Sequence, residues 1–405
     1  MTEPTDRAPL GPSARPLGPA DEPTGLRFLI AAGGTGGHVV PATSVAAELG
    51  KLSSGADFLF VGTGRPAEAE ILGPLGYRQK VLKVKPLVGK SPLKVLGAVF
   101  SLFTSLIRAV DLVRKHNPDM CLTFGGYVCG PVGLAAKIMG RPLVIHEQNC
   151  APGLTNRWLS RLADLVMVGF PETEESFKAK RVVFTGNPIR EDICRLAEAV
   201  RVPGKPPKLL AVGGSQGSKR LNLAVMALAE NLQAKGVDFS LTHQTGSQME
   251  AEVAARYRDL GLGERAQARA FISDMAGAYA QADLAITRAG ALTASELLAA
   301  KLPAILVPLP TAAGDHQTAN AKALAKLGLA RLVPEAELDY GALERVVLEL
   351  LEGPDKLREM SQTAEDSAKT AASVAPTMAG LCLETLKECR RAEAARLGKA
   401  SPDSD

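Results

Sequence analysis

The chain has few of the features that mark specialised protein classes. Aromatic residues make up only 4% of its 405 residues, and the net charge is only +4. Scarce aromatics for base stacking and a weak basic excess argue against a nucleic-acid-binding protein. The rest of the composition, 46% hydrophobic and 22% charged, is ordinary for a globular protein. A length of about 150 residues per domain predicts two or three domains, each with its own core.

Cysteine, histidine and aspartate do not occur in metal-binding spacings. The six cysteines include no C-x-x-C pair, no H-x-x-x-H pair occurs, and the only D-x-D sequence is residues 403–405. We therefore expect neither a metal nor another cofactor. In a chain of this size without a secretory signal, the cysteines are expected to be reduced thiols in a cytosolic compartment.

The sequence also lacks a run of about 20 apolar residues that could cross a membrane. Residues 120–136 are uncharged, but glycines and Pro131 interrupt them. Residues 1–25 combine six prolines with mixed charges and no apolar segment. We expect them to form a disordered tail rather than a signal peptide.

Strand-like and helix-like segments alternate along the chain. Apolar runs predict strands at residues 27–32, 57–62, 79–84, 120–125, 142–148 and 165–170, and again at 208–213, 239–245, 268–273, 284–287, 303–310 and 330–334. Such strands, linked by helices of which the longest is expected at 92–116, predict parallel sheets covered on both faces. We predict an α/β fold of two doubly wound, Rossmann-like domains, at residues 26–187 and 188–370. A helix at 371–390 is expected to return to the first domain, before a disordered tail at 391–405.

Two glycine-rich turns begin the two halves. Residues 33–37 read Gly-Gly-Thr-Gly-Gly, and residues 213–217 read Gly-Gly-Ser-Gln-Gly. Each follows a strand and precedes a helix, where backbone N–H groups and the helix dipole favour an anion. The first turn is not a dinucleotide fingerprint, since Val39 stands where glycine or alanine is required, and no Lys-Ser pair makes it a P-loop. Two such turns predict that phosphates are held from both sides of a cleft.

His38 follows the first turn and has two interpretations. It is either a helix-start residue with a local hydrogen bond or a base that removes a hydroxyl proton, because an imidazole titrates near neutral pH.

Residues 287–296 and 315–321 also have a structural and a functional interpretation, and for Thr293 and Glu296 the spacing favours the structural one. Thr293 and Glu296 have the spacing of a capping box, yet the Glu296 carboxylate would also suit two ribose hydroxyls. Asp315 suits a helix N-cap, whereas Gln317 and Asn320 suit sugar hydroxyls. Residues 146–149, His-Glu-Gln-Asn, are polar at the end of a strand that should be apolar, a mismatch that is typical of a functional site.

Lysines precede an apolar stretch at residues 95–107. They either form a solvated face before a core helix or attract an anionic membrane that the apolar helix start enters. These lysines are Lys80, Lys83, Lys85, Lys90 and Lys94, and the apolar helix start is Leu93, Leu96 and Phe100.

Seven motifs follow one another along the chain: GGTGGHVVPA (33–42), FGGYVCGP (124–131), HEQN (146–149), GNPIR (186–190), GGSQGS (213–218), TRAGALTASE (287–296) and DHQTANA (315–321). From residue 26 to residue 390 the chain therefore resembles the MurG family, the N-acetylglucosaminyltransferases that make lipid II in bacterial peptidoglycan synthesis. The resemblance implies the GT-B glycosyltransferase fold, with two facing Rossmann-like domains, the active site between them and no metal for binding the nucleotide sugar.

The resemblance also implies residue roles. His38 would be the general base, Glu296 would take the ribose hydroxyls, Ser215 would meet the diphosphate, and the backbone of Ile272 would hold uracil. The full donor set would be Thr35, Gly36, Gly37, Asn149, Arg190, Ser215, Ile272, Ala291, Leu292, Thr293, Ala294, Ser295, Glu296 and Gln317. The diphosphate of the acceptor would be cradled by Gly33, Gly34, Gly125, Gly126 and Tyr127.

The implied reaction is that of an inverting hexosyltransferase. GlcNAc would move from UDP-GlcNAc to the 4-hydroxyl of MurNAc in undecaprenyl-diphospho-MurNAc-pentapeptide (lipid I), releasing UDP during cell-wall biogenesis, which serves cell shape and division. The implied location is peripheral, on the cytoplasmic face of the bacterial plasma membrane, in contact with anionic lipid and with other cell-wall synthesis proteins.

Two alternatives belong to other classes. A non-hydrolysing UDP-GlcNAc 2-epimerase would share the fold but not the motif at residues 146–149. A non-catalytic binding protein for a UDP-sugar or a lipid would not need His38, Glu296 and Gln317, all of which are present.

Overall fold

The computed structural model describes residues 24–34, 36–84, 92–214 and 217–399. For residues 92–100, 102, 313, 340, 354 and 397–399 the backbone alone is described. Thr35, Ser215, Lys85, Lys90, residues 1–23 of the predicted N-terminal tail and residues 400–405 of the predicted C-terminal tail lie outside the described residues. The expectation of a disordered tail from residue 391 is wrong for residues 391–399, which continue the last helix to Lys399.

The strands form two fully parallel sheets, which confirms the predicted α/β class. The first sheet has seven strands in the order β3-β2-β1-β4-β5-β6-β7, and the second has six in the order β10-β9-β8-β11-β12-β13. The strands of the first sheet are β1 (Arg27–Ala31), β2 (Asp57–Gly62), β3 (Arg78–Val81), β4 (Met120–Thr123), β5 (Leu143–Glu147), β6 (Leu165–Val168) and β7 (Val182–Phe184). Those of the second are β8 (Lys208–Val212), β9 (Ser240–Gln244), β10 (Ala266–Arg269), β11 (Leu284–Thr287), β12 (Ala304–Leu306) and β13 (Ala330–Leu332).

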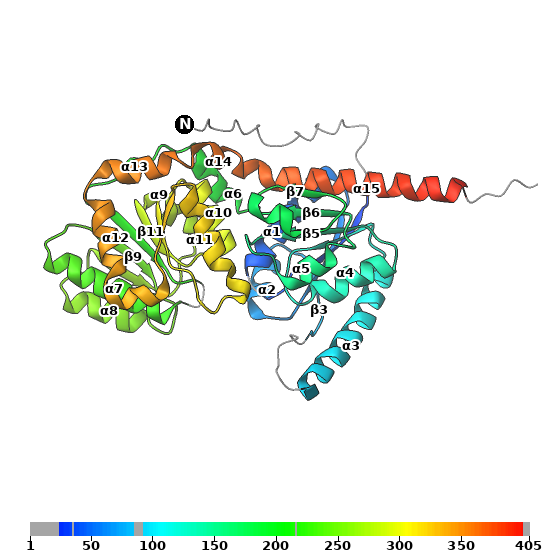
Figure 1. Cartoon of the computed structure of the whole chain (residues 1–405), viewed down its shortest axis with the longest axis horizontal. Coiled ribbons are helices and arrows are strands. Elements are labelled where there is room, and N and C mark those ends of the chain that lie inside the picture. The colour runs from blue at the N-terminus through cyan, green and yellow to red at the C-terminus, as the bar shows by residue number, and fades with distance from the viewer. Residues whose placement is uncertain (1–23, 35, 85–91, 215–216, 400–405) are drawn as a thin grey trace, which may run out of the picture.

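Helices connect the strands and cover both faces of each sheet (Figure 1). Those of the first half are α1 (Gly36–Leu52), α2 (Pro66–Leu72), α3 (Pro92–His116), α4 (Cys129–Ile138), α5 (Leu154–Leu159), η2 (Pro171–Ser176), α6 (Glu191–Cys194) and η3 (Arg195–Glu198). The second half has α7 (Lys219–Ala234), α8 (Glu250–Asp259), α9 (Met275–Gln281), α10 (Ala291–Ala299), η4 (Ala313–Asp315), α11 (His316–Lys326), η5 (Glu335–Tyr340), α12 (Ala342–Leu351), α13 (Pro354–Gln362), α14 (Glu365–Lys369), η6 (Ala371–Ser373) and α15 (Val374–Lys399). Within the described ranges, none of these helices combines the length and apolar character needed to cross a membrane.

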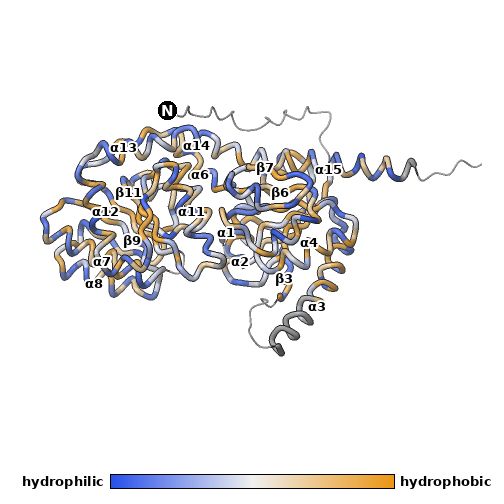
Figure 2. Tube along the Cα trace, in the orientation of Figure 1, coloured by the Kyte–Doolittle hydropathy of each residue, from blue (hydrophilic) through white to orange (hydrophobic). Residues whose placement is uncertain are grey.

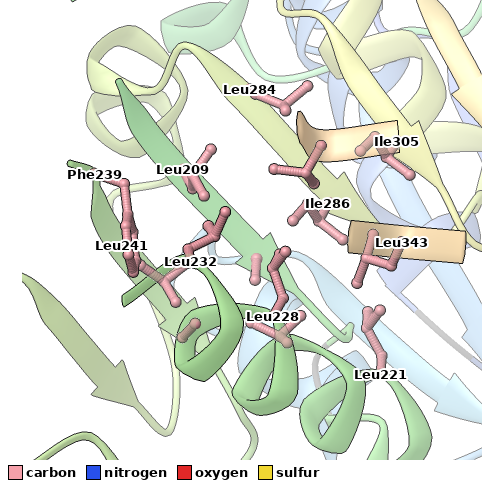
Figure 3. Close-up of a cluster of buried hydrophobic side chains, with 14 of the residues drawn as sticks. Leu209, Leu221, Leu228, Leu232, Phe239, Leu241, Leu284, Ile286, Ile305 and Leu343 are labelled. Atoms are coloured by element: carbon pink, nitrogen blue, oxygen red, sulfur yellow. The ribbon is translucent and has the colours of Figure 1, made fainter. Parts of the chain in front are cut away.

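Alternate residues of each central strand enter different cores. Phe28 and Ile30 of β1 pack with α1, whereas Leu29 and Ala31 pack with α3 and α4 on the other face. In the second sheet, Leu209 packs against Leu228 and Leu232 of α7, as Figure 3 shows. Figure 2 shows the apolar residues gathered on inner strands such as β6 and β11. Burial on both faces explains why these strands read as continuous apolar runs.

The register aligns the ends of neighbouring strands. Ala31 of β1 pairs with Val61 of β2 and Thr123 of β4. In the second sheet, Val212 of β8 pairs with Gln244 of β9 and Thr287 of β11. The loops that leave the carboxyl ends of these strands therefore start side by side, which is where ligands bind in doubly wound sheets.

The last helix packs on the first domain. Val374, Met378 and Cys382 of α15 are buried in the core that contains α1. Ion pairs add to this contact, between Arg390 and Asp119 at 2.5 Å and between Arg181 and Glu384 at 3.3 Å. The predicted domain boundaries near residues 187 and 370 stay predictions.

The observed strands differ from the expected ones at three places. The strand expected at 303–310 is β12 at Ala304–Leu306, so residues 307–310 follow the strand. The strand expected at 268–273 is β10 at Ala266–Arg269, because the apolar pair Phe271 and Ile272 follows the strand. β7 was not expected; it is three residues long, half-buried and at the sheet edge, so its apolar signal is short.

Candidate active site

His38 lies in the first turn of α1, against the loop that follows β4. Its Nδ1 atom is 2.8 Å from the carbonyl oxygen of Gly33. Because a carbonyl only accepts, the neutral ring carries its hydrogen on Nδ1 and leaves the Nε2 lone pair to accept a proton. Burial lowers the pKa of His38, while the Gly33 carbonyl and the charge of Glu147 raise it and His316 lowers it; the net shift is downward. The imidazole is therefore neutral at neutral pH.

The glycines beside His38 are required by close packing. Gly125 and Gly126 have φ values of 103° and 87°, a region that side chains rarely adopt. A Cβ atom at Gly125 would lie 2.7 Å from Cδ2 of His38. The Gly33 N–H donates to the Gly125 carbonyl at 3.3 Å, so the two glycine turns of the first domain are joined. Tyr127, next in the chain, is 51% exposed.

A buried carboxylate that sequence reasoning missed holds these turns. Glu68 of α2 is fully buried and accepts hydrogen bonds from the N–H groups of Gly34 (2.8 Å), Thr63 (3.0 Å) and Gly64 (2.9 Å). The Thr63 hydroxyl (2.6 Å) and Gln79 Nε2 (3.0 Å) also donate to it. Burial raises the pKa of Glu68, but the hydrogen bonds from Thr63, Gly34 and Gly64 outweigh it, so the net shift is downward. The N–H of Gly34 is thus engaged by Glu68.

The polar residues at the end of β5 are mostly buried. Glu147 is 3% exposed and accepts from the Asn149 N–H (3.0 Å), the Gly153 N–H (3.0 Å) and Asn156 Nδ2 (3.0 Å). His146 lies edge-on to Phe124, and burial lowers its pKa to about 3. These polar groups fold the loop after β5, which explains the polar strand end.

The loops at the carboxyl ends of the two sheets meet through amide side chains. Asn320 of α11 accepts from the Cys150 N–H at 2.9 Å and donates to Oδ1 of Asn149 at 3.4 Å. Asn187 donates to the Gln148 carbonyl and to the Ser295 hydroxyl, both at 3.0 Å. The structure therefore brings Asn149 near Ser295, two residues of the predicted donor set that come from different halves of the chain.

Gln244 links the second glycine turn to Ile272. Its Nε2 donates to the Gly214 carbonyl at 3.0 Å, and its Oε1 accepts from the Ile272 N–H at 2.9 Å. The Ile272 N–H is thus engaged within the protein, and the predicted contact of the Ile272 backbone with uracil stays a prediction.

A cation lies beside the second turn. Arg288 forms an ion pair with Glu335 and donates to the Ser218 hydroxyl at 2.6 Å. Ser218 caps α7 by accepting from the Leu221 N–H at 3.4 Å.

The capping-box interpretation of Thr293 and Glu296 is wrong. Helix α10 begins at Ala291 after Gly290, so Thr293 lies inside the helix. The chain leaves β11 at Thr287 and the helix begins at Ala291, whereas the capping box predicts that the helix begins only after Thr293. Glu296 instead accepts a hydrogen bond from the Tyr279 hydroxyl at 3.0 Å. Burial raises the pKa of Glu296, and the Tyr279 hydrogen bond and the charge of Arg190 only partly offset it.

The remaining predicted donor residues differ in placement. Gln317, in the first turn of α11, accepts from the Leu309 N–H at 2.9 Å. Asp315 precedes this helix as expected, but its carboxylate accepts from the Thr318 hydroxyl at 2.6 Å rather than from a backbone N–H. Arg190 precedes α6 and lies 3.9 Å from Asp192. Leu292 is partly exposed, whereas Ala294 is fully buried. Gly36 and Gly37 open α1.

Metal ligands do not gather in the part of the chain that the structure describes, where no group of three or more His, Cys, Asp or Glu side chains could hold an ion. The groups that do gather are a neutral imidazole, glycine turns and hydrogen-bonding side chains. They suit proton removal from a hydroxyl and the binding of phosphate and sugar groups.

Two family models match the chain, the glycosyltransferase family 28 N-terminal domain over residues 28–168 and the C-terminal domain over residues 209–375. The chain is 43% identical, over 359 residues, to the UDP-N-acetylglucosamine--N-acetylmuramyl-(pentapeptide) pyrophosphoryl-undecaprenol N-acetylglucosamine transferase of Methylococcus capsulatus. That alignment covers 88% of this chain and 98% of the relative.

Solved structures match over similar lengths. Acinetobacter baumannii MurG superposes with a TM-score of 0.73 at 33% identity, covering 89% of this chain and 99% of that chain. A putative UDP-N-acetylglucosamine 2-epimerase from Listeria monocytogenes superposes with a TM-score of 0.59 at 14% identity, covering 86% and 94%, which shows a shared fold alone.

Proposed function

Because the chain belongs to glycosyltransferase family 28, we propose that it moves GlcNAc from UDP-GlcNAc to the 4-hydroxyl of MurNAc in undecaprenyl-diphospho-MurNAc-pentapeptide. Its two facing Rossmann-like domains form the GT-B fold, and it is an N-acetylglucosaminyltransferase. The reaction turns lipid I into lipid II and releases UDP.

One observation carries this proposal. The loops from the carboxyl ends of the two sheets meet at Asn149 and Asn320, with His38 on the first domain and Glu296 on the second. Base and donor-binding carboxylate thus belong to opposite domains, as a reaction between two separately bound substrates requires.

His38 would act as the base on the acceptor. Its Nδ1–H is fixed by the Gly33 carbonyl, so Nε2 takes the proton from the 4-hydroxyl. The hydroxyl oxygen forms a bond to the anomeric carbon while the bond from that carbon to the UDP oxygen breaks on the opposite side. An α-linked donor therefore gives a β-linked product.

The second domain would bind the donor and stabilise the departing diphosphate. Glu296 accepts ribose hydroxyls, the carbonyl of Ile272 meets uracil, and Gln317 and Asn149 hold the sugar. The N-termini of α7 and α10 direct backbone N–H groups and positive dipole ends toward the leaving charge. The glycines of the first domain, joined at Gly33 and Gly125, cradle the diphosphate of the acceptor.

We also propose peripheral contact with anionic lipid on the cytoplasmic face of the plasma membrane. Helices α3, α4 and α5 pack side by side, and each leaves large apolar side chains exposed. These are Phe103 (60%), Ile107 (55%), Ile138 (57%), Leu154 (81%) and Trp158 (53%). Arg108, Arg157 and Arg161 on the same helices or next to them are exposed cations. Apolar and basic side chains together favour an interfacial position.

The structure places Lys83, one of the lysines named from the sequence, beside α3. Lys83 is exposed, and its carbonyl accepts from the Ser105 hydroxyl of α3 at 3.0 Å. Lys94 is in the part of α3 where only the backbone is described.

The proposed reaction is tested by incubating the protein with UDP-GlcNAc and a short-chain lipid I analogue. We expect UDP and the disaccharide product to appear in equal amounts, and neither without the acceptor. Formation of UDP-ManNAc without transfer would indicate an epimerase, and binding of UDP-GlcNAc with no product would indicate a binding protein; either result contradicts the proposal.

A further inference from the structure

Tyr279 of α9 is a buried tyrosine whose hydroxyl bonds a carboxylate of the predicted donor set. Its side chain is 1% exposed, and its hydroxyl donates to Oε2 of Glu296 at 3.0 Å. Burial and the neighbouring Glu296 charge raise the pKa of Tyr279 well above its usual value, so the hydroxyl keeps its proton and remains the donor. The hydrogen bond therefore fixes one oxygen of the carboxylate.

Arg201, from the segment between the two sheets, holds the two helices that carry this pair. Its guanidinium donates to the carbonyl of Ala282 at 2.6 Å and to that of Tyr279, both at the end of α9. It also donates to the carbonyl of Ala300, at the end of α10, at 2.5 Å. Both helices thus end on one rigid planar group, which sets the position of Tyr279 relative to Glu296.

We propose that Tyr279 is a positioning residue for the donor, whose hydroxyl orients the Glu296 carboxylate toward the ribose and so makes the enzyme select ribose over 2′-deoxyribose. This inference rests on the proposed role of Glu296 as the acceptor of ribose hydroxyls.

The chemistry of a carboxylate explains the need for such a residue. Its two oxygens offer about four lone-pair positions, and Tyr279 occupies one of them on Oε2. Two ribose hydroxyls can use the others only if the carboxylate plane is fixed. A partly buried carboxylate such as that of Glu296 would also be harder to keep ionised without this donor, because burial favours the neutral acid.

The test compares UDP-GlcNAc with its 2′-deoxyribose analogue as donors for the wild type and for Tyr279→Phe. We expect the variant to raise the KM for UDP-GlcNAc about tenfold, the order of a lost hydrogen bond to a charged group. The kcat should change little, and the KM for the deoxy analogue should rise less than the KM for UDP-GlcNAc. The ratio of the two KM values, which measures the preference for ribose, should therefore fall.

Tyr257→Phe is the matched control. Tyr257 is also fully buried in the second domain, and its hydroxyl lies 2.7 Å from Nδ1 of His243. We expect this variant to lower Tm while leaving donor KM and ribose preference unchanged. If Tyr279→Phe also lowers Tm while leaving donor KM and ribose preference unchanged, the inference is overturned.

Glu296→Gln tests the ribose role of Glu296 separately from the positioning role of Tyr279. If it removes the preference for ribose and Tyr279→Phe does not narrow it, the role of Glu296 stands and that of Tyr279 is overturned. If the wild type turns over both donors with equal KM, the ribose role of Glu296 fails and the inference fails with it. Calorimetric binding of UDP and 2′-deoxy-UDP gives the same comparison without turnover.

Discussion

The imidazole of His38 packs so closely against Gly125 that a Cβ atom there would lie 2.9 Å from Nε2. Since Nδ1 is bound to the Gly33 carbonyl, Nε2 is the atom that accepts a proton, and it lies at the turn proposed to hold the acceptor. The base and the acceptor site are thus built from the same packed turns.

His38→Ala should lower kcat by roughly 10²–10⁴-fold, the usual contribution of a positioned general base. UDP binding, measured by calorimetry, should be nearly unchanged because the donor residues lie mainly on the second domain. His116→Ala is a matched control, since His116 also bonds a main-chain carbonyl, that of Phe28, at 3.1 Å, but at the opposite end of β1. A loss of kcat below tenfold for His38→Ala would mean that His38 only positions its neighbours.

Glu296→Ala should raise the donor KM, since the ribose hydroxyls lose a charged acceptor that contributes roughly 1.5–3 kcal/mol. Glu296 and Thr293 do not form a capping box, because α10 begins at Ala291. We therefore do not expect Glu296→Ala to lower Tm through loss of a helix cap. Both quantities are measured on one purified variant. An unchanged KM would remove Glu296 from the donor site.

Phe103→Ser with Trp158→Ser should weaken binding to anionic vesicles while leaving turnover of a soluble acceptor intact, because both side chains are more than half exposed. Neutralising Lys83, Lys85, Lys90 and Lys94 should weaken it further and make it less sensitive to salt, as each basic residue near the surface contributes about 1 kcal/mol.

The control for vesicle binding is Leu223→Ser, which removes an exposed leucine from α7 of the second domain. Co-sedimentation that is equal for the control, both variants and the wild type, at low and high salt, would contradict membrane contact through α3 and α5.

Acid should destabilise the fold through two buried histidines. Burial lowers the pKa of His146 and of His243 to about 3, whereas an unfolded histidine titrates near 6.5. Between these values the unfolded chain binds more protons, so the free energy of unfolding falls as pH falls. From pH 6.5 to pH 5 the loss is about 1.6 kcal/mol for each histidine, because the unfolded histidine is already half protonated at pH 6.5. Denaturant unfolding at both pH values measures it.

His243→Gln isolates one of the two contributions. We expect the variant to be less stable at neutral pH, because it disturbs the contact with Tyr257, but to lose less stability on acidification. An acid loss as large as that of the wild type would show that other groups cause it.

The sequence predicts the two sheets well because burial on both faces produces continuous apolar runs. The expected helix at 92–116 has the observed bounds. Of the polar residues 146–149, Asn149 contacts Asn320 of the second domain, and the functional site expected there stays a prediction. Local sequence patterns give a wrong interpretation where the path of the chain from a neighbouring strand sets the start of a helix. Thr293 and Glu296 fit a cap by spacing, but the exit of the chain from β11 starts the helix at Ala291.

Other parts of the site could not be predicted because their partners are distant in sequence. Glu68 reads as an ordinary acidic residue of a short helix, and only the alignment of β1 with β2 brings Gly34 and Thr63 to it. Tyr279 and Glu296 are joined by the packing of α9 and α10, which carries no sequence signature.

The anomeric configuration of the product tests the central claim most directly. The protein is incubated with α-linked UDP-GlcNAc and a soluble lipid I analogue, and the new glycosidic bond is assigned by NMR. A base on the first domain and a donor bound on the second predict a β-linked GlcNAc on the 4-oxygen of MurNAc, with one UDP released per bond. An α-linked disaccharide, or an epimerised sugar nucleotide with no transfer, would contradict it.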